Sequence, residues 1–342
     1  MKALVLKKDF SLELSEISKP VISPYEVLVY LKASALNHRE LWIQKGLYPG
    51  MALPCVLGAD GAGIVTEVGS NVNAEWIDKE VIIYPAYDWG SNEEAPTRKF
   101  RVLGMPDPGT ISEYIKVPVA NMIEKPDYLT FAEAAVIPVA GLTAWRALVK
   151  HGQLTKGKSV LITGIGGGVA QAGLGITKAY GAKVYVTSSS QAKIDQAIAQ
   201  GASGGVLYTD PDWNIQLKEL SKGIDIVLDS SPSPVLDDYF KFLNYGARIV
   251  TYGSTGARKT TVNISKFFLR HIQFIGTAMG SPADFKALIA FMDEHKIKPA
   301  IYARYPIDQA IQAMDALREG KQTGKIVIEH NVKDKSLTQV KI

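Results

Sequence analysis

Short runs of alternating apolar and polar residues dominate the chain up to about residue 120. Alternation with a period of two is the pattern of half-buried strands. The clearest runs, separated by turns such as Lys19-Pro20 and Ser23-Pro24, are Lys2–Leu6, Glu26–Ala33, Gly61–Val68 and Glu80–Tyr84. The segment Tyr84–Gly109 is dense in proline, glycine and charge, which predicts a long loop of the kind that is often functional. We therefore expect an all-β unit, a small barrel, at the start of the chain.

The pattern changes near Thr130 to helices and buried strands in alternation. Helices are expected at Phe131–Ala135 and Leu142–Lys150, with a break around 138–141. The strands expected next are Ser159–Thr163, Lys183–Thr187, Gly205–Tyr208, Asp225–Asp229, Arg248–Tyr252 and Gln273–Thr277, and the helices are Val169–Tyr180, Ser190–Gln200 and one near Pro234–Leu243. This spacing predicts the α/β class, with a doubly wound parallel sheet that carries helices on both faces.

The last part of the chain mixes the two patterns. We expect a helix at Pro282–His295, a strand at Ala303–Pro306, a helix at Ile307–Gly320 and a strand at Lys325–Glu329, and then a frayed polar tail, Asn331–Ile342. The chain has 342 residues, and because domains commonly hold about 100–200 residues, two domains are expected.

Composition narrows the class of protein. An apolar share of 46% supplies two cores, and the net charge of +4 is spread without a basic block, which argues against a nucleic-acid role. The single cysteine, Cys55, excludes an intrachain disulfide and a four-thiolate zinc site. The N-terminus lacks a long apolar core, and the most apolar stretch, 131–149, is interrupted by Glu133 and Arg146, so we expect no membrane helix and a cytoplasmic enzyme.

A glycine-rich turn, Gly164-Ile165-Gly166-Gly167-Gly168-Val169-Ala170, connects an expected strand to an expected helix. Glycines let backbone amides approach a pyrophosphate, and the new helix points its positive end at the phosphates. The spacing departs from G-x-G-x-x-G, because the third small residue would fall on Val169; Ala170 is expected to pack the helix on the strand. We predict a dinucleotide here, with a ligand-free flexible loop as the alternative. The expected contacts are Gly164, Gly166, Gly167, Gly168 and Val169.

The residues after the next strand indicate which dinucleotide. NAD-specific folds place an acid about 20 residues beyond the turn, to bind the ribose 2′-hydroxyl. Here Ser188, Ser189 and Ser190 follow the strand, Lys193 comes three residues later, and the first acid is Asp195. Hydroxyls and a cation suit a 2′-phosphate, so NADP(H) is predicted. The alternative is that the serines only cap the following helix.

Several separate stretches resemble one family. They are Asn37-His38-Arg39-Glu40-Leu41-Trp42-Ile43-Gln44-Lys45-Gly46-Leu47-Tyr48, Leu57–Val65 with Val68-Gly69, and Leu129–Ala135 with Gly141-Leu142-Thr143-Ala144-Trp145. To about residue 330 the chain resembles the medium-chain dehydrogenase/reductase superfamily, and within it the zinc-free quinone oxidoreductase and enone reductase branch. The resemblance implies a GroES-like β-barrel catalytic domain, 1–124 with 276–342, a Rossmann domain, 125–275, and a cleft between them for the nicotinamide. It also implies a homodimer.

The resemblance implies roles for residues outside the glycine turn as well. Ser188 takes the position of the acid of NAD-using relatives, and Tyr208 and Lys193 resemble contacts to the 2′-phosphate. Thr143 in the hinge, Lys325 in Thr323–Val327 and Asn263 are implied cofactor contacts.

The departures from zinc-dependent relatives are equally informative. The position of their liganding cysteine holds Asn37, and the position of their liganding histidine and the glutamate that follows it holds Ala59-Asp60. The loop that carries their structural zinc has no cysteine here. We therefore expect no metal site; His38, Asp60 and Cys55 are the alternative ligand set.

Without a metal, reduction of a simple carbonyl lacks support for the developing alkoxide, whereas quinones and α,β-unsaturated carbonyls delocalise the charge. The predicted function is therefore an NADPH-dependent, zinc-independent reductase of quinones or enones. Asn37 is expected to orient a substrate oxygen or the nicotinamide ribose, and Tyr48 to donate a hydrogen bond. The alternatives are a turn role for Asn37, barrel packing for Tyr48, and a turn role for Asp60. At the level of the whole protein, the alternatives are a zinc-dependent alcohol dehydrogenase with atypical ligands and a non-enzymatic NADPH-binding sensor or structural protein.

Overall fold

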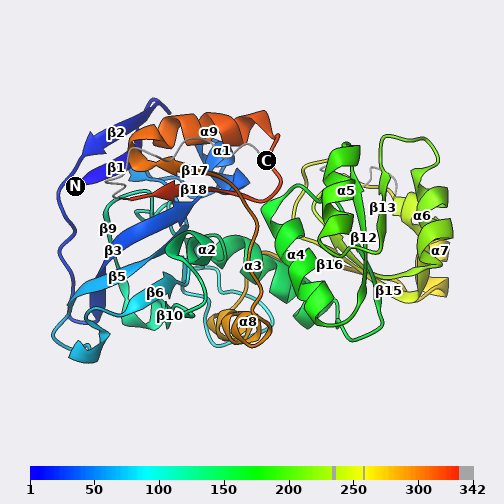
Figure 1. Ribbon diagram of the computed structural model, residues 1–342, viewed down its shortest axis with the longest axis horizontal. Helices are drawn as coiled ribbons and strands as arrows, with labels where there is room; N and C mark the ends of the chain where they lie inside the picture. Colours follow the sequence, from blue (N-terminus) through cyan, green and yellow to red (C-terminus); the bar gives the residue numbers. More distant parts are fainter. Residues whose placement is uncertain (233–235, 257–258, 331–342) are drawn as a thin grey trace. The chain divides into compact units, whose positions relative to one another are not determined.

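The computed structural model describes residues 1–232, 236–256 and 259–330, and the expected tail lies outside these ranges. The chain divides into two compact units, which are described separately (Figure 1). The first comprises Met1–Ala140 and the segment from Ser281 onward, and the second is Gly141–Gly280. Within the described ranges, no helix is long and apolar enough to cross a membrane.

The first unit is built on two sheets whose strands pair antiparallel, except for the parallel pair β17–β18. Its larger sheet has the order β10-β6-β5-β3-β18-β17, with β9 also on β3, and the smaller sheet has the order β2-β1-β4. The strands are β1 (Lys2–Leu6), β2 (Leu12–Glu16), β3 (Glu26–Ala35), β4 (Cys55–Val56), β5 (Asp60–Val68), β6 (Glu80–Ile83), β9 (Tyr114–Pro118), β10 (Met122–Glu124), β17 (Ile301–Pro306) and β18 (Lys325–Glu329). Antiparallel pairing of β18 with β3 inserts the C-terminal segment into the N-terminal sheet.

Four helices of the described chain pack on the sheets of this unit, and one of them, α2, shows where the unit ends in the sequence. They are α1 (His38–Gln44), α2 (Phe131–Ala135), α8 (Pro282–His295) and α9 (Ala310–Glu319). The apolar face of α9, including Met314 and Leu317, shares one core cluster with Leu4 and Leu6 of β1. Helix α2 packs on β3 and β5, so the change of unit falls after Ala140, later than the change in sequence pattern suggests.

The expected long loop after β6 contains two short strands, β7 (Ala86–Tyr87) and β8 (Arg101–Val102), which pair with each other. Arg101 pairs with the carboxylates of Asp88 and Asp107. The rings of Trp89 and Phe100 meet edge to face with centroids 5.4 Å apart. These contacts give the loop its order.

The second unit is the predicted parallel sheet, with strand order β13-β12-β11-β14-β15-β16. The strands are β11 (Ser159–Ile162), β12 (Lys183–Ser188), β13 (Gly204–Leu207), β14 (Ile224–Asp229), β15 (Leu243–Thr251) and β16 (Gln273–Gly276), and the helices are α4 (Gly168–Ala179), α5 (Gln191–Ala199), α6 (Trp213–Ser221) and α7 (Ile264–Leu269). The sheet winds outward in both directions from β11 and β14, and ligands of such sheets bind at this switch point.

Two local expectations are corrected. A helix break was expected around 138–141, but α3 (Pro138–Trp145) begins there and runs into a π-helical turn, Arg146–His151. The reason is that proline is compatible with the first turn of a helix, where its missing N–H has no intrahelical acceptor. The helix expected near Pro234–Leu243 is a 3₁₀ helix at Leu236–Lys241, and residues 233–235 lie outside the described ranges.

Candidate active site

The glycine-rich turn lies between β11 and α4, at the carboxyl edge of the sheet. Gly164 has a φ of +62°, a left-handed conformation that favours glycine. Ile165 is buried and anchors the turn by donating its N–H to the Thr187 carbonyl at 3.0 Å. Gly167 is the N-cap of α4, so the N–H groups of 168–170 lie in the first turn, where a helix supplies no acceptor. These amides and the positive helix end suit a pyrophosphate.

Close packing of α4 on the sheet depends on a glycine as well as on the predicted Ala170, which is buried. A Cβ at Gly173 would lie 2.5 Å from the side chain of Leu228 on β14. Helix and strand therefore approach each other at Gly173, and this holds the start of α4 above the end of β11.

A buried carboxylate fixes the residue that precedes the turn. Asp229, at the end of β14, accepts hydrogen bonds from the Thr163 hydroxyl at 2.9 Å and the Tyr239 hydroxyl at 3.0 Å. The backbone N–H of Ser231 donates to the same carboxylate at 3.0 Å. Burial raises the pKa of Asp229, while these donors act in the opposite direction. Asp229 thus joins the ends of β11 and β14, a connection that the sequence does not reveal.

The predicted 2′-phosphate residues gather at the end of β12. Ser188 is buried, and its hydroxyl accepts a hydrogen bond from the Ser190 N–H at 3.1 Å. The N–H of Tyr208 donates to the Ser188 carbonyl at 3.1 Å, while the Tyr208 side chain is half exposed. Lys193 lies in the first turn of α5, where burial lowers the pKa of its ammonium. Ser190 is the N-cap of α5 but makes no side-chain capping bond.

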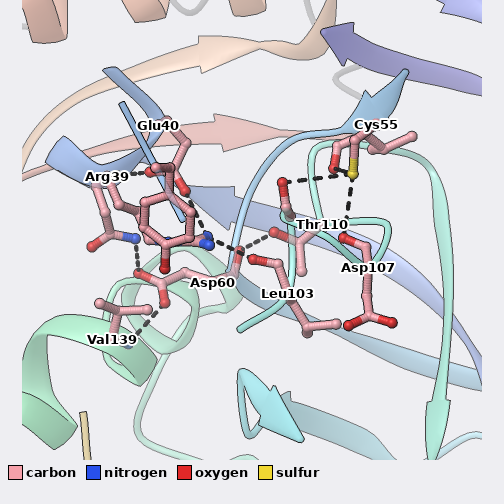
Figure 2. A network of polar contacts seen from close by, with 12 residues as sticks. Arg39, Glu40, Cys55, Asp60, Leu103, Asp107, Thr110 and Val139 are labelled. Carbon is pink, nitrogen blue, oxygen red and sulfur yellow. Dashed lines mark hydrogen bonds and ion pairs between the residues drawn. The ribbon is translucent and has the colours of Figure 1, made fainter. Parts of the chain in front are cut away.

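The first unit contains a compact polar cluster of Asn37, Asp60 and Lys325, and Figure 2 shows Asp60 and its surroundings. Lys325 donates from Nζ to Asp60 Oδ2 at 2.9 Å and to Asn37 Oδ1. Asn37 Nδ2 donates to the same Asp60 oxygen at 2.9 Å. The other oxygen, Oδ1, accepts the Val139 N–H at 2.8 Å. Asp60 is fully buried, and the Lys325 side chain is 7% exposed.

These contacts determine how the Asn37 amide points. Its oxygen faces the Lys325 ammonium and its nitrogen faces the Asp60 carboxylate, so a flipped amide would set donor against donor and acceptor against acceptor. Among the described residues, one N–H of Asn37 Nδ2 therefore has no acceptor. The expected turn role is only partly right, because Asn37 is the N-cap of α1 but its side chain bonds to Asp60 and Lys325.

Glu40 and Arg39 form the next layer. Glu40 is fully buried, accepts the Asn37 N–H at 2.6 Å, and lies 3.3 Å from the Arg39 guanidinium. Burial raises the pKa of Glu40, and the positive charges of Arg39 and Lys325 oppose that shift. Glu40 thereby fixes the start of α1, the element that carries Asn37.

Arg39 in turn places Tyr48. Its guanidinium lies over the Tyr48 ring, 4.8 Å from the centroid, and its Nε lies 3.4 Å from the Tyr48 hydroxyl oxygen. Arg39 is itself held by the Leu103 carbonyl at 2.6 Å (Figure 2). Since Arg39 can only donate, Tyr48 accepts at this contact and keeps its own O–H to donate. Arg39 and Glu40 were not predicted as site residues; a charged pair directly after Asn37 was the available signal.

The alternative zinc ligands are not brought together. The Cys55 sulfur faces backbone carbonyls, among them Asp107 O at 3.4 Å, on the far side of the network from Val139 (Figure 2), and burial raises the pKa of its thiol to about 11. His38 is exposed on α1. In the described ranges, no three His, Cys, Asp or Glu side chains are grouped to hold a metal. At the expected ligand positions stand an amide, Asn37, and a methyl group, Ala59, with a lysine ammonium beside them, so this donor set does not fit zinc.

The remaining predicted residues are dispersed. Thr143 is buried in α3, and Asn263 caps α7 by accepting the Lys266 N–H at 3.2 Å. Lys325, expected to contact the cofactor, lies in the first unit beside Asn37 and Asp60. The sequence therefore identifies Asn37 and Lys325 separately but not their contact.

Comparison with known proteins shows which family has this architecture. The family described as "Alcohol dehydrogenase GroES-like domain" matches residues 23–127, and the family described as "Zinc-binding dehydrogenase" matches residues 168–294. The chain is 36% identical to "Zinc-type alcohol dehydrogenase-like protein YogA" of Leptosphaeria maculans, over 94% of this chain and 95% of the relative. The chain belongs to the medium-chain dehydrogenase/reductase superfamily.

Other members of the superfamily agree in fold and length. A solved structure described as "NAD-dependent alcohol dehydrogenase" superimposes with a TM-score of 0.90 at 34% identity, and covers 96% of this chain and 99% of that chain. The "Quinone oxidoreductase" of Mus musculus is 27% identical over 92% of both proteins. As a member of this superfamily, the chain is an oxidoreductase with a GroES-like unit and a Rossmann unit.

Proposed function

We propose that this medium-chain oxidoreductase is an NADPH-dependent, zinc-independent reductase of quinones or α,β-unsaturated carbonyls. The observation that carries the proposal is the Asn37–Asp60–Lys325 cluster, in which an ammonium and an amide occupy the surroundings expected for metal ligands. The names of relatives include both zinc-type dehydrogenases and a quinone oxidoreductase, so the choice rests on these residues.

The residues at the end of β12 support the phosphorylated cofactor. Ser188 supplies a hydroxyl and no charge where a carboxylate would repel a 2′-phosphate. Lys193 and the half-exposed Tyr208 add a cation and a further hydroxyl to the same edge of the sheet. When bound, the reduced nicotinamide supplies a hydride. The residues of this chain position the reactants and stabilise charge.

The substrate class follows from the donors in the first unit. The spare N–H of Asn37 and the O–H of Tyr48 are neutral hydrogen-bond donors. Neutral donors suit an oxyanion whose charge is delocalised, as in an enolate or a hydroquinone anion, better than a localised alkoxide.

Turnover of purified protein tests the proposal. NADPH and NADH are each offered with a panel of quinones, enals, enones and simple aldehydes, with and without a chelator, and the metal content is measured. We expect turnover of quinones or enones with NADPH, unaffected by the chelator. Stoichiometric zinc with chelator-sensitive alcohol oxidation would instead make the chain a zinc alcohol dehydrogenase. Tight NADPH binding without turnover of any acceptor would indicate the non-enzymatic alternative.

A further inference from the structure

A buried glutamine connects helix α4 back to the glycine-rich turn. Gln171 is the fourth residue of α4 and is 8% exposed, and its Nε2 donates to the Ile165 carbonyl at 2.8 Å. Side chains of a helix lean toward its N-terminus, which brings an amide at this position back over the residues that precede the helix. The N–H of Ile165 is bound as well, to the Thr187 carbonyl at 3.0 Å. Residues outside the turn therefore hold both backbone polar groups of Ile165.

The bond from Gln171 fixes the direction of the next N–H along the chain. The peptide between Ile165 and Gly166 is planar and trans, so its C=O and its N–H point to opposite sides. The carbonyl is buried against Gln171, and the Gly166 N–H therefore points the other way. Gly166 is partly exposed, and among the described residues its N–H has no acceptor. This N–H is available to a ligand of the turn.

We propose that Gln171 is a positioning residue for the cofactor, which holds the Ile165–Gly166 peptide so that the Gly166 N–H faces the pyrophosphate. The inference rests on the part of the proposed function in which a dinucleotide binds at the turn. Without the Gln171 amide, rotation of this peptide would turn its carbonyl toward the phosphates, and the two negative groups would repel each other. The backbone of Gly166 permits that rotation, because glycine adopts positive φ without steric strain.

The need to satisfy a buried carbonyl does not by itself explain a glutamine. The Val169 N–H lies four residues beyond Ile165, the spacing of an α-helical hydrogen bond, and would bind this carbonyl if the helix began one turn earlier. Instead α4 begins at Gly168, and in the described chain the Ile165 carbonyl accepts from Gln171. The Val169 N–H consequently stays in the first turn of the helix, where a helix supplies no acceptor. The glutamine thus leaves two N–H groups, those of Gly166 and Val169, for an anion.

The first test compares two ligands that differ in the pyrophosphate. NADP⁺ carries the pyrophosphate and the 2′-phosphate, whereas 2′-AMP carries the 2′-phosphate alone. Gln171→Met keeps the length of the side chain but removes its N–H donors. In calorimetric titrations we expect this variant to bind NADP⁺ about 10-fold more weakly than wild type does, the effect of one hydrogen bond to a charged group, and to bind 2′-AMP equally well. Gln216→Met, exposed on α6, should change neither affinity.

The outcomes of this comparison separate the inference from the proposed function. Unchanged NADP⁺ affinity in Gln171→Met would overturn the inference. An equal loss for both ligands would also overturn it, because that result indicates general damage to the second unit. If wild type binds NAD⁺ and not NADP⁺, the phosphorylated cofactor of the proposed function is wrong, and NAD⁺ and adenosine become the pair of ligands that tests Gln171. If wild type binds neither dinucleotide, both proposals fail.

A second variant tests the hydrogen bond itself. In Gln171→Glu the side chain can donate to the Ile165 carbonyl only while its carboxyl group is protonated, and burial favours the protonated form. We expect this variant to approach wild-type NADP⁺ affinity at low pH and to weaken relative to wild type as the pH rises, with 2′-AMP binding in step with wild type throughout. Thermal unfolding identifies the pH range in which the variant is folded. NADP⁺ affinity equal to that of Gln171→Met over this whole range would overturn the inference.

Discussion

At the scale of single residues, Ser188 is the residue that we propose lies next to the adenosine ribose of the cofactor. A carboxylate there would accept hydrogen bonds from a 2′-hydroxyl and repel a 2′-phosphate. We expect Ser188→Asp to lower the ratio of NADPH to NADH efficiency, measured as kcat/KM, by about 10-fold or more. Ser203→Asp adds the same charge to an exposed turn and should leave the ratio unchanged. An unaltered ratio in Ser188→Asp would reject the 2′-phosphate assignment.

A second residue links folding to pH. His330 is buried, its Nε2 lies 2.8 Å from the Ser34 hydroxyl, and its Nδ1 has no partner among the described residues. Ser34 donates to the Thr110 carbonyl, so it accepts from the His330 Nε2–H, and the ring is neutral. Burial lowers the pKa of His330 to about 3.

The sign of the effect follows from where the proton binds. Below the ordinary histidine pKa of about 6.5, the unfolded chain binds a proton that the folded chain refuses, so stability falls with falling pH. The loss is about 1.4 kcal/mol per pH unit, or about 2 kcal/mol at pH 5. We expect His330→Gln to show a shallower decline in unfolding free energy between pH 7.5 and 5 in urea titrations. The exposed His271→Gln should keep the wild-type slope, and an equal slope for His330→Gln would contradict the assignment.

At this scale, a site residue is predictable from the sequence when the residues that it acts with are close to it along the chain. Ser188, Lys193 and the turn glycines are local to one strand–turn–helix unit, so pattern and spacing locate them. The Lys325–Asn37 contact requires β18 to pair with β3, and no local pattern carries that register. Arg39 and Glu40 are next to Asn37 in sequence, but only burial gives them their roles.

At the scale of elements, the loop after β6 is held by ion pairs. Arg101 meets Asp88 and Asp107, and its guanidinium lies 4.9 Å from the Tyr87 ring centroid. Exposed pairs contribute up to about 1 kcal/mol each, so Arg101→Met should cost about 1–2 kcal/mol and speed hydrogen exchange in the loop. Arg98→Met, exposed in the same loop, should have little effect. Faster exchange of the wild-type loop with a chelator would show that a metal holds it instead.

Element boundaries were predictable where an apolar segment is bounded by turn or capping signals. The bounds of β1, α2, α8 and β18 match the expected ones, because each is an apolar or amphipathic segment with a start or stop signal, such as the Ser281 cap of α8. Helix α1 was missed, since it is seven residues long and buries only Glu40 and Ile43. Helix α3 begins at Pro138, where the sequence pattern predicts a break, because proline is also compatible with the first turn of a helix.

At the scale of the whole molecule, the two-unit organisation was only partly readable. The alternation of strands and helices marks the Rossmann unit from the sequence alone. Return of the chain to the first unit after Gly280 rests on pairing of β18 with β3, which the family resemblance implied and composition did not.

We propose a surface for the expected homodimer within the second unit. Strand β16 ends the parallel sheet, so in the described chain its outer edge has no strand partner. Near it the large apolar side chains are exposed: Tyr245, Ile264, Phe268, Leu269 and Phe274. An open edge strand with exposed apolar residues favours pairing with another chain, and two identical edges pair about a two-fold axis.

Phe268→Glu combined with Phe274→Glu should therefore convert a dimer to a monomer in sedimentation measurements. The reason is that a two-fold interface places each new charge opposite or near its own copy, in an environment that excludes water. Ile311→Glu, on the exposed face of α9 in the first unit, should leave the dimer intact. A monomeric wild-type protein at micromolar concentration would reject the homodimer. A dimeric double variant would keep the dimer but move its interface away from β16 and α7.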